Sequence, residues 1–438
     1  MCRCNSVSKA VAFGLVFVLM ATTVEYALLR VDFRTFLTMN DMKYEDDIEW
    51  LFLGNSTSIT NINPFIIEEE TDHSAFILAR ISARMPGCVA MLKQLYCEGH
   101  KPEKVVFVLD SLMPARDSED ISVMAALAPF LAPHVRLDYI RATASIDDLW
   151  LDRTFLWRYD SNQSLEDFQK SLQAKNAKSN TEKIVNVANA YYSNRYLGRG
   201  HMRAINKHYY DQLARASHTI VDTKILDLSE AFIQNFNELR DICKQNGAEF
   251  IVCVVPIWKN LMFADQRYST ACNAVAEYCA SEGVPFFNFN YYDPERAVNL
   301  DPYFNDAGDH LLGEGADLFT REMLAEVLNK REAGEDVSSF FVTHEEWEAS
   351  VDYLTDAWFV SDEKDGVITY TAYAHHGTPV KPLFQFVQVA EDGSETVLRE
   401  YSAETAFSIA KDEVVGQVRM YAMNGAAVEQ EPLVYELN

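Results

Sequence analysis

From residue 46 to about residue 330, short apolar segments alternate with amphipathic segments of helical length, and this alternation restricts the possible folds more than any other feature. The segments predicted as strands are 48–53, 104–109, 249–255 and 285–289. Those predicted as helices are 75–98, 226–245 and 269–281. Strands that alternate with helices of this length predict an α/β fold of three layers, with a parallel sheet covered by helices on both faces.

Polar and aromatic residues follow three of the predicted strands, where ligands usually bind. Ligand sites in parallel α/β sheets lie beyond the carboxyl ends of the strands. Ser56 follows the first strand and Trp258 follows the third, while Asp110 and Ser111 follow the second. We therefore expect all four residues at one edge of the sheet. There, Asp110, Ser111 and Trp258 are candidate substrate-binding residues.

Between about residues 142 and 223 the alternation lapses, and the sequence becomes aromatic and locally basic with a mostly helical pattern. Two interpretations remain open. The segment is an ordinary helical insertion, or it is a cap that presents aromatic faces to a sugar or an acyl group. The α/β domain that contains this insertion is expected to span residues 40–333.

The pattern changes again in the C-terminal part of the chain. Runs of period two occupy residues 367–374, 383–390, 397–401 and 416–423. Asp392-Gly393 and Asn424-Gly425 supply hairpin turns between them. Several short strands without intervening helices predict an antiparallel β-sandwich domain over residues 340–438. His375 and His376 have no third ligand in view, so we expect them in an exposed loop rather than a metal site.

The N-terminal segment, residues 1–35, has the pattern of a membrane-targeting sequence. Arg3 and Lys9 precede an uncharged stretch over residues 10–24, and with the apolar residues beyond it the stretch approaches the roughly 20 residues that span a bilayer. The segment is either an uncleaved anchor or a cleaved signal peptide. Residues 21–23 make a poor cleavage site, which favours an anchor at the cell membrane with the domains outside the cytoplasm. Cleavage would instead give a secreted protein.

Charge and composition exclude several classes of function. The formal net charge is −27, and no cluster of Lys and Arg is present to neutralise phosphates, so a nucleic-acid partner is excluded. The eight cysteines lack the paired Cys/His spacing of a zinc site, and most are expected to be buried thiols that act as small hydrophobes. No glycine-rich phosphate loop occurs. We therefore expect neither a metal nor a nucleotide cofactor.

Two blocks of the sequence supply the parts of a hydroxyl nucleophile. A serine hydroxyl becomes reactive when a base takes its proton and preorganised donors hold the developing oxyanion. The first block, Gly54-Asn55-Ser56, ends the first strand in a turn that presents Ser56 and its backbone N–H at the sheet edge. The second block, residues 303–311, places His310 shortly before an amphipathic helix whose packing would fix the loop. Ser56 and His310 are therefore the predicted nucleophile and base.

Over about residues 46–330 the chain resembles the SGNH (GDSL-type) hydrolase superfamily, in particular its membrane-anchored, surface-facing branch that includes the D-alanyl-transfer protein. Gly54-Asn55-Ser56 matches the nucleophile turn of that superfamily. The resemblance implies a flavodoxin-like three-layer sheet. It also implies that a glycine N–H of the second block, for which Gly87 is the counterpart here, contributes to the oxyanion hole.

The carboxylate that orients His310 is ambiguous in the sequence. The family places an aspartate three residues before the histidine, whereas Asp306 lies four residues before His310 and Asp309 lies immediately before it. We favour Asp306, because adjacent side chains on a turn tend to diverge.

The oxyanion hole also departs from the pattern of the family. The asparagine of the third block is missing, since Asp110-Ser111 follow the second strand. The hole is therefore expected to depend on the N–H groups of Ser56 and Gly87, with Asn55 as a further candidate.

The resemblance implies an extracytoplasmic serine esterase or O-acyltransferase. It would act through an acyl-serine intermediate on an acyl donor or a cell-envelope polysaccharide or glycolipid, with the β-sandwich as a carbohydrate-contacting or spacer module. Hydrolysis and transfer share this intermediate and differ in whether water or an acceptor hydroxyl attacks it. The alternative is a non-catalytic envelope protein whose α/β domain binds a glycan or a protein partner. The missing asparagine and the irregular Asp–His spacing favour that alternative.

Overall fold

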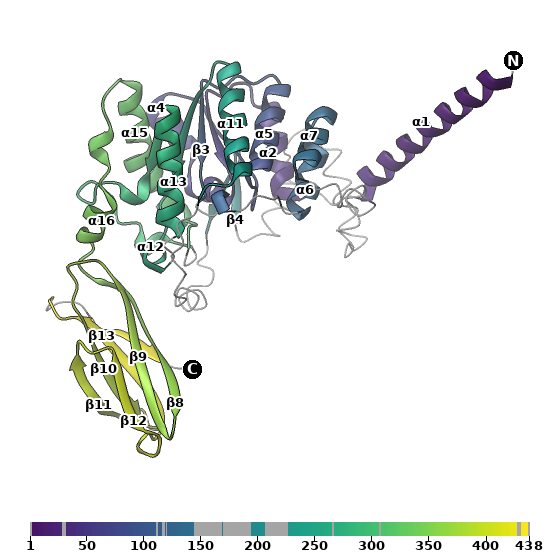
Figure 1. Ribbon diagram of the computed structural model, residues 1–438. Helices are drawn as coiled ribbons and strands as arrows, with labels where there is room; N and C mark the ends of the chain where they lie inside the picture. The colour runs from purple at the N-terminus through teal and green to yellow at the C-terminus, as the bar shows by residue number, and fades with distance from the viewer. Residues whose placement is uncertain are drawn as a thin grey trace.

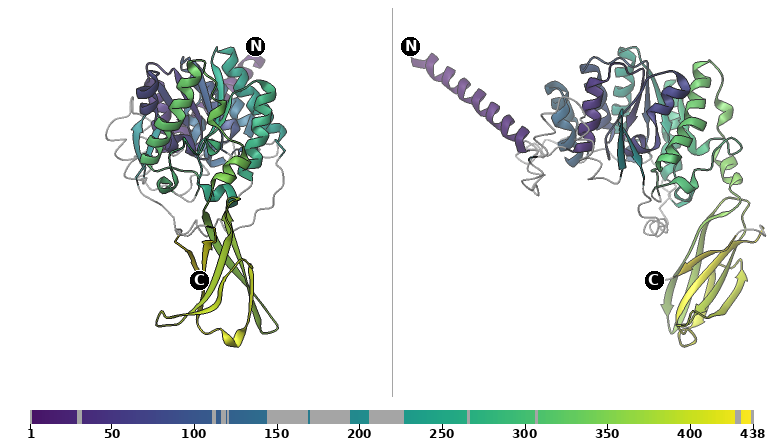
Figure 2. Two further views of the ribbon diagram at one scale, coloured as in Figure 1. Left: turned by 90° about the vertical axis from the view of Figure 1, so that its left-hand side faces the viewer. Right: turned by 180° about the vertical axis from the view of Figure 1, so that it is seen from behind.

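The structure is a computed structural model that describes residues 2–28, 32–110, 113–115, 119, 121–143, 169, 194–205, 227–264, 267–305, 308–426 and 431–436. Figures 1 and 2 show a helix-covered sheet followed by an all-β unit, with helix α1 (Cys2–Leu28) at the N-terminus. Apolar side chains along α1, such as Phe13 and Leu19, are exposed. Within the described residues, no helix has both the length and the hydropathy needed to cross a membrane.

A five-stranded parallel sheet forms the centre of the α/β unit. Its strands are β1 (Trp50–Gly54), β2 (Ala75–Ala79), β3 (Lys104–Val108), β6 (Glu249–Val254) and β7 (Phe286–Asn288). The spatial order is β2-β1-β3-β6-β7, so the chain builds outward in both directions from the boundary between β1 and β3. In doubly wound sheets such a boundary is the topological switch point, where ligands bind. The predicted parallel α/β architecture is confirmed.

Alternate side chains of each strand enter two different hydrophobic cores, one on each face of the sheet. In β1, Leu51 and Leu53 belong to one core, and Trp50 and Phe52 belong to the other. The helices on the first face are α5 (Met85–Cys97), α6 (Ile121–Leu127), α7 (Pro133–Thr143), α11 (Glu230–Gln245) and α13 (Arg267–Glu282). Those on the second are α3 (Ser56–Asn61), α4 (Pro64–Thr71), α14 (Gly313–Phe319) and α15 (Ala325–Glu332). Helix α2 (Phe33–Tyr44) contributes to both cores.

The expected helix over residues 75–98 is wrong in its first part. Residues 75–79 form strand β2 at the edge of the sheet, and α5 begins only at Met85. An uninterrupted apolar run buried on both sides has no period that distinguishes a strand from a buried helix. Pro86, in the first turn of α5, was the local signal that a helix begins there.

Within the predicted helical insertion, residues 194–204 form a β-hairpin and not a helix. Strands β4 (Asn194–Gly198) and β5 (His201–Ala204) pair antiparallel. The turn between them covers part of the exposed edge of the sheet, because the N–H of Ile77 in β2 donates to the carbonyl of Arg199 over 3.0 Å. Residues 142 and 143 end helix α7, and apart from these, residue 169 and residue 205, the rest of the expected insertion or cap lies outside the described residues.

Gly200 in this turn is required sterically as well as conformationally. Its φ is +77°, and a Cβ there would lie 1.8 Å from the carbonyl oxygen of Ile77. Gly247 has a φ of +78° with no atom near its Cβ position, so it is a matched control. We expect Gly247→Ala to lower the free energy of unfolding by about 1 kcal/mol and Gly200→Ala by about 3 kcal/mol, measured by urea denaturation. Equal losses would show that the hairpin turn does not pack tightly against β2.

The C-terminal unit consists of two antiparallel sheets that share one hydrophobic core. The strands are β8 (Leu354–Lys364), β9 (Val367–His376), β10 (Pro382–Val389), β11 (Glu395–Ser402), β12 (Ala406–Ala410), β13 (Gln417–Asn424) and β14 (Leu433–Glu436). The orders are β11-β10-β13-β14 and β12-β9-β8. The predicted runs of period two correspond to β9, β10, β11 and β13. This confirms the antiparallel arrangement.

A buried polar network joins the β unit to the α/β unit, close to helix α16 (His344–Ser350), which connects them. Asn260 of α12 (Lys259–Ala264) is fully buried. Its Oδ1 lies 2.8 Å from Nδ1 of His375, and its Nδ2 donates to Asp356 over 3.1 Å. The expectation that His375 and His376 lie in an exposed loop is wrong, since both belong to strand β9. His375 is the next-to-last residue of strand β9 and is half-buried, because its ring contacts another domain, a contact that sequence spacing does not reveal.

The described cysteines behave largely as expected. The six beyond helix α1 are free, and five of them, Cys88, Cys243, Cys253, Cys272 and Cys279, are buried. Burial raises the pKa of Cys253 and Cys272 to about 12, so these thiols stay protonated and pack as apolar groups. Cys97 is exposed and differs from the prediction.

Candidate active site

Ser56 is the first residue of helix α3, directly beyond the carboxyl end of β1 and at the switch point of the sheet. Asn55 precedes it as the N-cap, and its Oδ1 accepts the N–H of Thr57 over 3.1 Å. Gly54 permits the close approach of β1 to β3, since a Cβ there would lie 2.9 Å from the carbonyl oxygen of Val108. Gly54 and Asn55 therefore fix the backbone position from which the Ser56 side chain extends.

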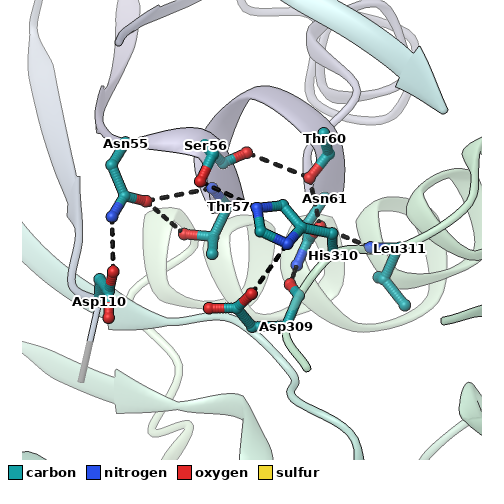
Figure 3. Close-up of polar contacts among 9 residues, drawn as sticks. All are labelled: Asn55, Ser56, Thr57, Thr60, Asn61, Asp110, Asp309, His310 and Leu311. Atoms are coloured by element: carbon teal, nitrogen blue, oxygen red, sulfur yellow. Dashed lines mark hydrogen bonds and ion pairs between the residues drawn. The ribbon is translucent and has the colours of Figure 1, made fainter. Parts of the chain in front are cut away.

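His310 reaches the same point from the other end of the α/β unit. Its segment pairs with the chain just before it: Phe304 and Leu311 form an antiparallel bridge, and the N–H of Asn305 donates to the His310 carbonyl over 2.7 Å. The imidazole Nε2 lies 2.9 Å from Oγ of Ser56 (Figure 3). The structure thus brings the predicted nucleophile and base within hydrogen-bond distance.

Asp309 completes a line of three side chains. Its Oδ1 lies 2.9 Å from Nδ1 of His310, on the side of the ring opposite Ser56 (Figure 3). Both side chains are largely but not completely buried. The premise that adjacent side chains diverge is therefore wrong here. The backbone bends at residues 308 and 309 and turns the carboxylate back toward the ring. Asp306, which we favoured from the sequence, lies outside the described residues, as does Ser111.

Asn55 and Asp110 contact each other across the switch point. Nδ2 of Asn55 donates to Oδ2 of Asp110 over 2.7 Å, so the end of β1 is tied to the end of β3 (Figure 3). Asn55 is 3% exposed, and both ends of its amide already have partners. This arrangement gives Asn55 a role in shaping the nucleophile turn. It leaves Asp110 as a carboxylate at the sheet edge that supports that turn.

The N–H of Gly87 is occupied by a carboxylate. It donates to Oε2 of Glu119 over 2.9 Å, and the N–H of Arg84 donates to Oε1 over 3.2 Å. The start of helix α5 is therefore occupied by a carboxyl group of the chain itself, at the end of the helix where N–H groups lack partners within the helix. Of the expected oxyanion donors, the N–H of Ser56 belongs to the first N–H groups of α3, which have no partner within the helix.

Glu119 gives a pH-dependent contribution to stability. Burial raises its pKa from 4.5 to about 7, against the opposing effect of the two backbone N–H donors. The folded chain therefore holds this proton more tightly than the unfolded chain. The free energy of unfolding should fall as pH rises from about 4.5 to 7, by roughly 3 kcal/mol from this group.

Glu119→Gln should remove that loss, because the amide does not ionise. Urea denaturation of both proteins at pH 5 and pH 8 measures the difference. His201 also has a shifted pKa, lowered to about 4 by burial, but it is present in both proteins and cancels in the comparison. An identical pH dependence in wild type and variant would contradict the buried position of the carboxylate.

Trp258, expected to bind substrate, contacts the histidine segment through its backbone. Its N–H donates to the carbonyl of Gly308 over 2.9 Å, and its side chain is half-buried. The loop after β6 therefore supports the segment that carries Asp309 and His310.

Asn61 was not among the residues singled out from the sequence. It is the last residue of α3, and its side chain contacts the backbone on both sides of His310. The available signal was weak: a polar residue ends a helix in which Thr57 to Asn61 are all buried. A buried amide requires partners, but the sequence does not show which ones.

Comparisons with known proteins identify no relative. A search against models of known families finds none that matches the chain. No curated protein and no solved structure matches it significantly. Within the described residues, no group of three His, Cys, Asp or Glu side chains is placed to hold a metal ion.

Proposed function

We propose that this protein is a serine esterase or O-acyltransferase that acts through an acyl-serine intermediate. The observation that carries the proposal is the line of contacts from Ser56 through His310 to Asp309, each 2.9 Å long. A hydroxyl, an imidazole and a carboxylate in this order form the arrangement that makes serine nucleophilic on several unrelated folds. The position of the line, at the switch point of a parallel sheet, is where substrates bind in such folds.

The reaction follows from this geometry. Nε2 of His310 takes the proton of Ser56 as Oγ forms a bond to the ester carbonyl carbon, and Asp309 stabilises the resulting imidazolium. The tetrahedral intermediate collapses when the bond to the leaving alkoxide breaks, and the imidazolium returns its proton to that oxygen. Water or an acceptor hydroxyl then attacks the acyl-serine in the reverse sequence. The two outcomes are hydrolysis and transfer.

The strand order of the parallel sheet, numbered along the chain as 2-1-3-4-5, is the order of flavodoxin-like sheets and supports membership of the SGNH superfamily.

The cellular setting is part of the same proposal. The exposed apolar side chains of α1, together with the basic residues before them, support a membrane anchor with the domains outside the cytoplasm. An acylated or acetylated cell-envelope polysaccharide or glycolipid is the proposed substrate, with the β unit as a contact or spacer module.

A second candidate is a non-catalytic protein that binds a glycan or an envelope protein partner. Two observations favour it: the Gly87 N–H is occupied by Glu119, and the Asn55 amide is occupied by Asp110. With these donors engaged, stabilisation of an oxyanion depends on the start of α3. Loss of one such donor typically costs about 10²- to 10³-fold in rate.

Acyl-enzyme formation separates the two candidates. The full chain in detergent is incubated with 4-nitrophenyl acetate and with longer acyl esters, with and without a sugar acceptor. The proposal predicts an initial burst of nitrophenol, an acyl adduct in the intact mass, and release of the adduct by water or acceptor. Absence of both burst and adduct, in a protein that still binds a glycan, would favour the non-catalytic candidate.

A further inference from the structure

Asn61 makes a pair of hydrogen bonds in opposite directions to the segment that carries the base. Its Nδ2 donates to the carbonyl of Asp309 over 2.6 Å, and its Oδ1 accepts the N–H of Leu311 over 2.9 Å (Figure 3). Oδ1 also accepts the hydroxyl of Thr60 over 2.8 Å. The Asn61 side chain is fully buried, so each lost contact would leave a buried polar group without a partner.

The two backbone groups that Asn61 contacts flank His310. On its other edge, the carbonyl of His310 accepts the N–H of Asn305, and the N–H of Leu312 donates to Tyr303, each over 2.7 Å. The backbone at His310 is thus held from both sides, as in a central strand of a sheet, with one side chain in place of the second strand. Rotation of the backbone at this residue would break at least one of these bonds.

We propose that Asn61 is a positioning residue that sets His310 in register with Ser56. Both Ser56 and Asn61 belong to α3, so the same short helix carries the nucleophile and fixes the position of its base. This inference rests on the proposed function for its catalytic consequence. The placement of the imidazole that it describes can be measured separately.

The carboxamide is the group this position requires. One end must donate to a carbonyl and the other must accept from an N–H, and a carboxamide offers a donor and an acceptor side by side. Aspartate has two acceptors, so Asn61→Asp would place an oxygen against the Asp309 carbonyl. Alanine removes both contacts. Glutamine carries the same group on a longer side chain in a site that is completely buried.

The opposite side of α3 is anchored independently. Nδ1 of the buried His201 lies 3.0 Å from the carbonyl oxygen of Ile59, near the end of the helix. Since burial holds the pKa of His201 at about 4, the ring is neutral at physiological pH and donates from Nδ1. Helix α3 is therefore held against β5 by a contact that does not involve the Asn61 side chain, whose amide contacts the histidine segment.

Asn63 provides a matched control. It is 7% exposed, caps helix α4 through Phe65 N–H over 3.1 Å, and donates to Asp317 over 2.7 Å. Asn63→Ala therefore removes a buried asparagine with two partners close to Asn61, but with no contact to the histidine segment in the described hydrogen bonds. Any general effect of losing a buried amide should appear in both variants.

The test measures kinetics and the imidazole itself. Asn61→Ala should lower kcat for an activated ester by about 10²-fold with KM nearly unchanged, because the base is displaced from Ser56 while the ground-state contacts remain. The ¹⁵N imidazole resonances of His310, assigned with His310→Ala in a histidine-labelled full chain, should shift in Asn61→Ala. Asn63→Ala should leave both readouts as in the wild type. If Asn61→Ala does not fold, Asn61→Asp is used, since it keeps the volume and the Leu311 contact.

The outcomes separate this inference from the proposed function. If the wild type is active and an Asn61 variant changes neither kcat nor the His310 resonances, the inference is overturned. Equal changes in the Asn63 variant would also overturn it, because the effect would then be general. If the wild type has no esterase activity but the His310 resonances shift only in the Asn61 variant, the positioning role stands and the proposed function fails.

Discussion

Replacing His310 with alanine is expected to lower kcat/KM for an activated ester by about 10⁴- to 10⁶-fold. The imidazole is the group that takes the proton of Ser56 over their 2.9 Å contact, and without it the hydroxyl is a weak nucleophile at neutral pH. Steady-state kinetics on a short-chain 4-nitrophenyl ester measure the loss.

Further variants show whether the loss of activity is specific to the pair of Ser56 and His310. Ser56→Ala should lose a similar amount, and the double variant should be no worse than either single one, because residues that act as a unit are strongly non-additive. His344 is a matched control, since its imidazole contacts Tyr291 and Trp347. His344→Ala should keep the wild-type kcat/KM. A His310→Ala enzyme within about tenfold of the wild type would be inconsistent with general base catalysis by this residue.

Asp309→Asn is expected to lower kcat by about 10³- to 10⁴-fold with little change in the fold. The amide is isosteric with the carboxylate. The amide cannot stabilise the imidazolium, however. In the wild type, Oδ1 of Asp309 lies 2.9 Å from Nδ1 of His310. If the NH₂ group of the asparagine faces Nδ1 instead, it would favour the wrong tautomer of His310. Kinetics at saturating ester, compared with the wild type, give the change in kcat directly.

Asp306→Asn distinguishes the two carboxylates that the sequence left open. Because Asp309 contacts the ring, Asp306→Asn should leave kcat within about tenfold of the wild type. A large loss in Asp306→Asn with a small loss in Asp309→Asn would assign the orienting role to Asp306, the residue that we favoured from the sequence.

The architecture was largely accessible from hydrophobic patterning. Strands β1, β3, β6 and β7 are short apolar runs bounded by turns, and alternation with helices is enough to predict a parallel sheet. Strand β2 was missed, because an uninterrupted apolar segment of five residues shortly before a helix has no period of its own. The order of the strands in the sheet could not be predicted from the hydrophobic pattern either, since it depends on contacts between segments far apart in the chain.

The residues of the candidate site also differ in whether the sequence reveals them. Ser56 and His310 could be found because each lies in a local motif, a strand–turn–helix in one case and a loop before an amphipathic helix in the other. Asn61 could not, because its partner Asp309 is 248 residues away. The occupant of the Gly87 N–H was hidden for a similar reason: Glu119 approaches from a separate loop. Local signals identify reactive groups, whereas long-range contacts decide how those groups are held and which donors are free.

Covalent modification of Ser56 by a fluorophosphonate tests the central claim most directly. The full chain is incubated with the probe, digested, and mapped by tandem mass spectrometry in wild type, Ser56→Ala and His310→Ala. We predict modification of Ser56 in the wild type, none in Ser56→Ala and a strongly reduced rate in His310→Ala, since phosphonylation needs the same activated hydroxyl as ester cleavage. An unmodified wild type, or equal labelling of Ser56→Ala, would contradict the assignment of Ser56 and His310 as nucleophile and base.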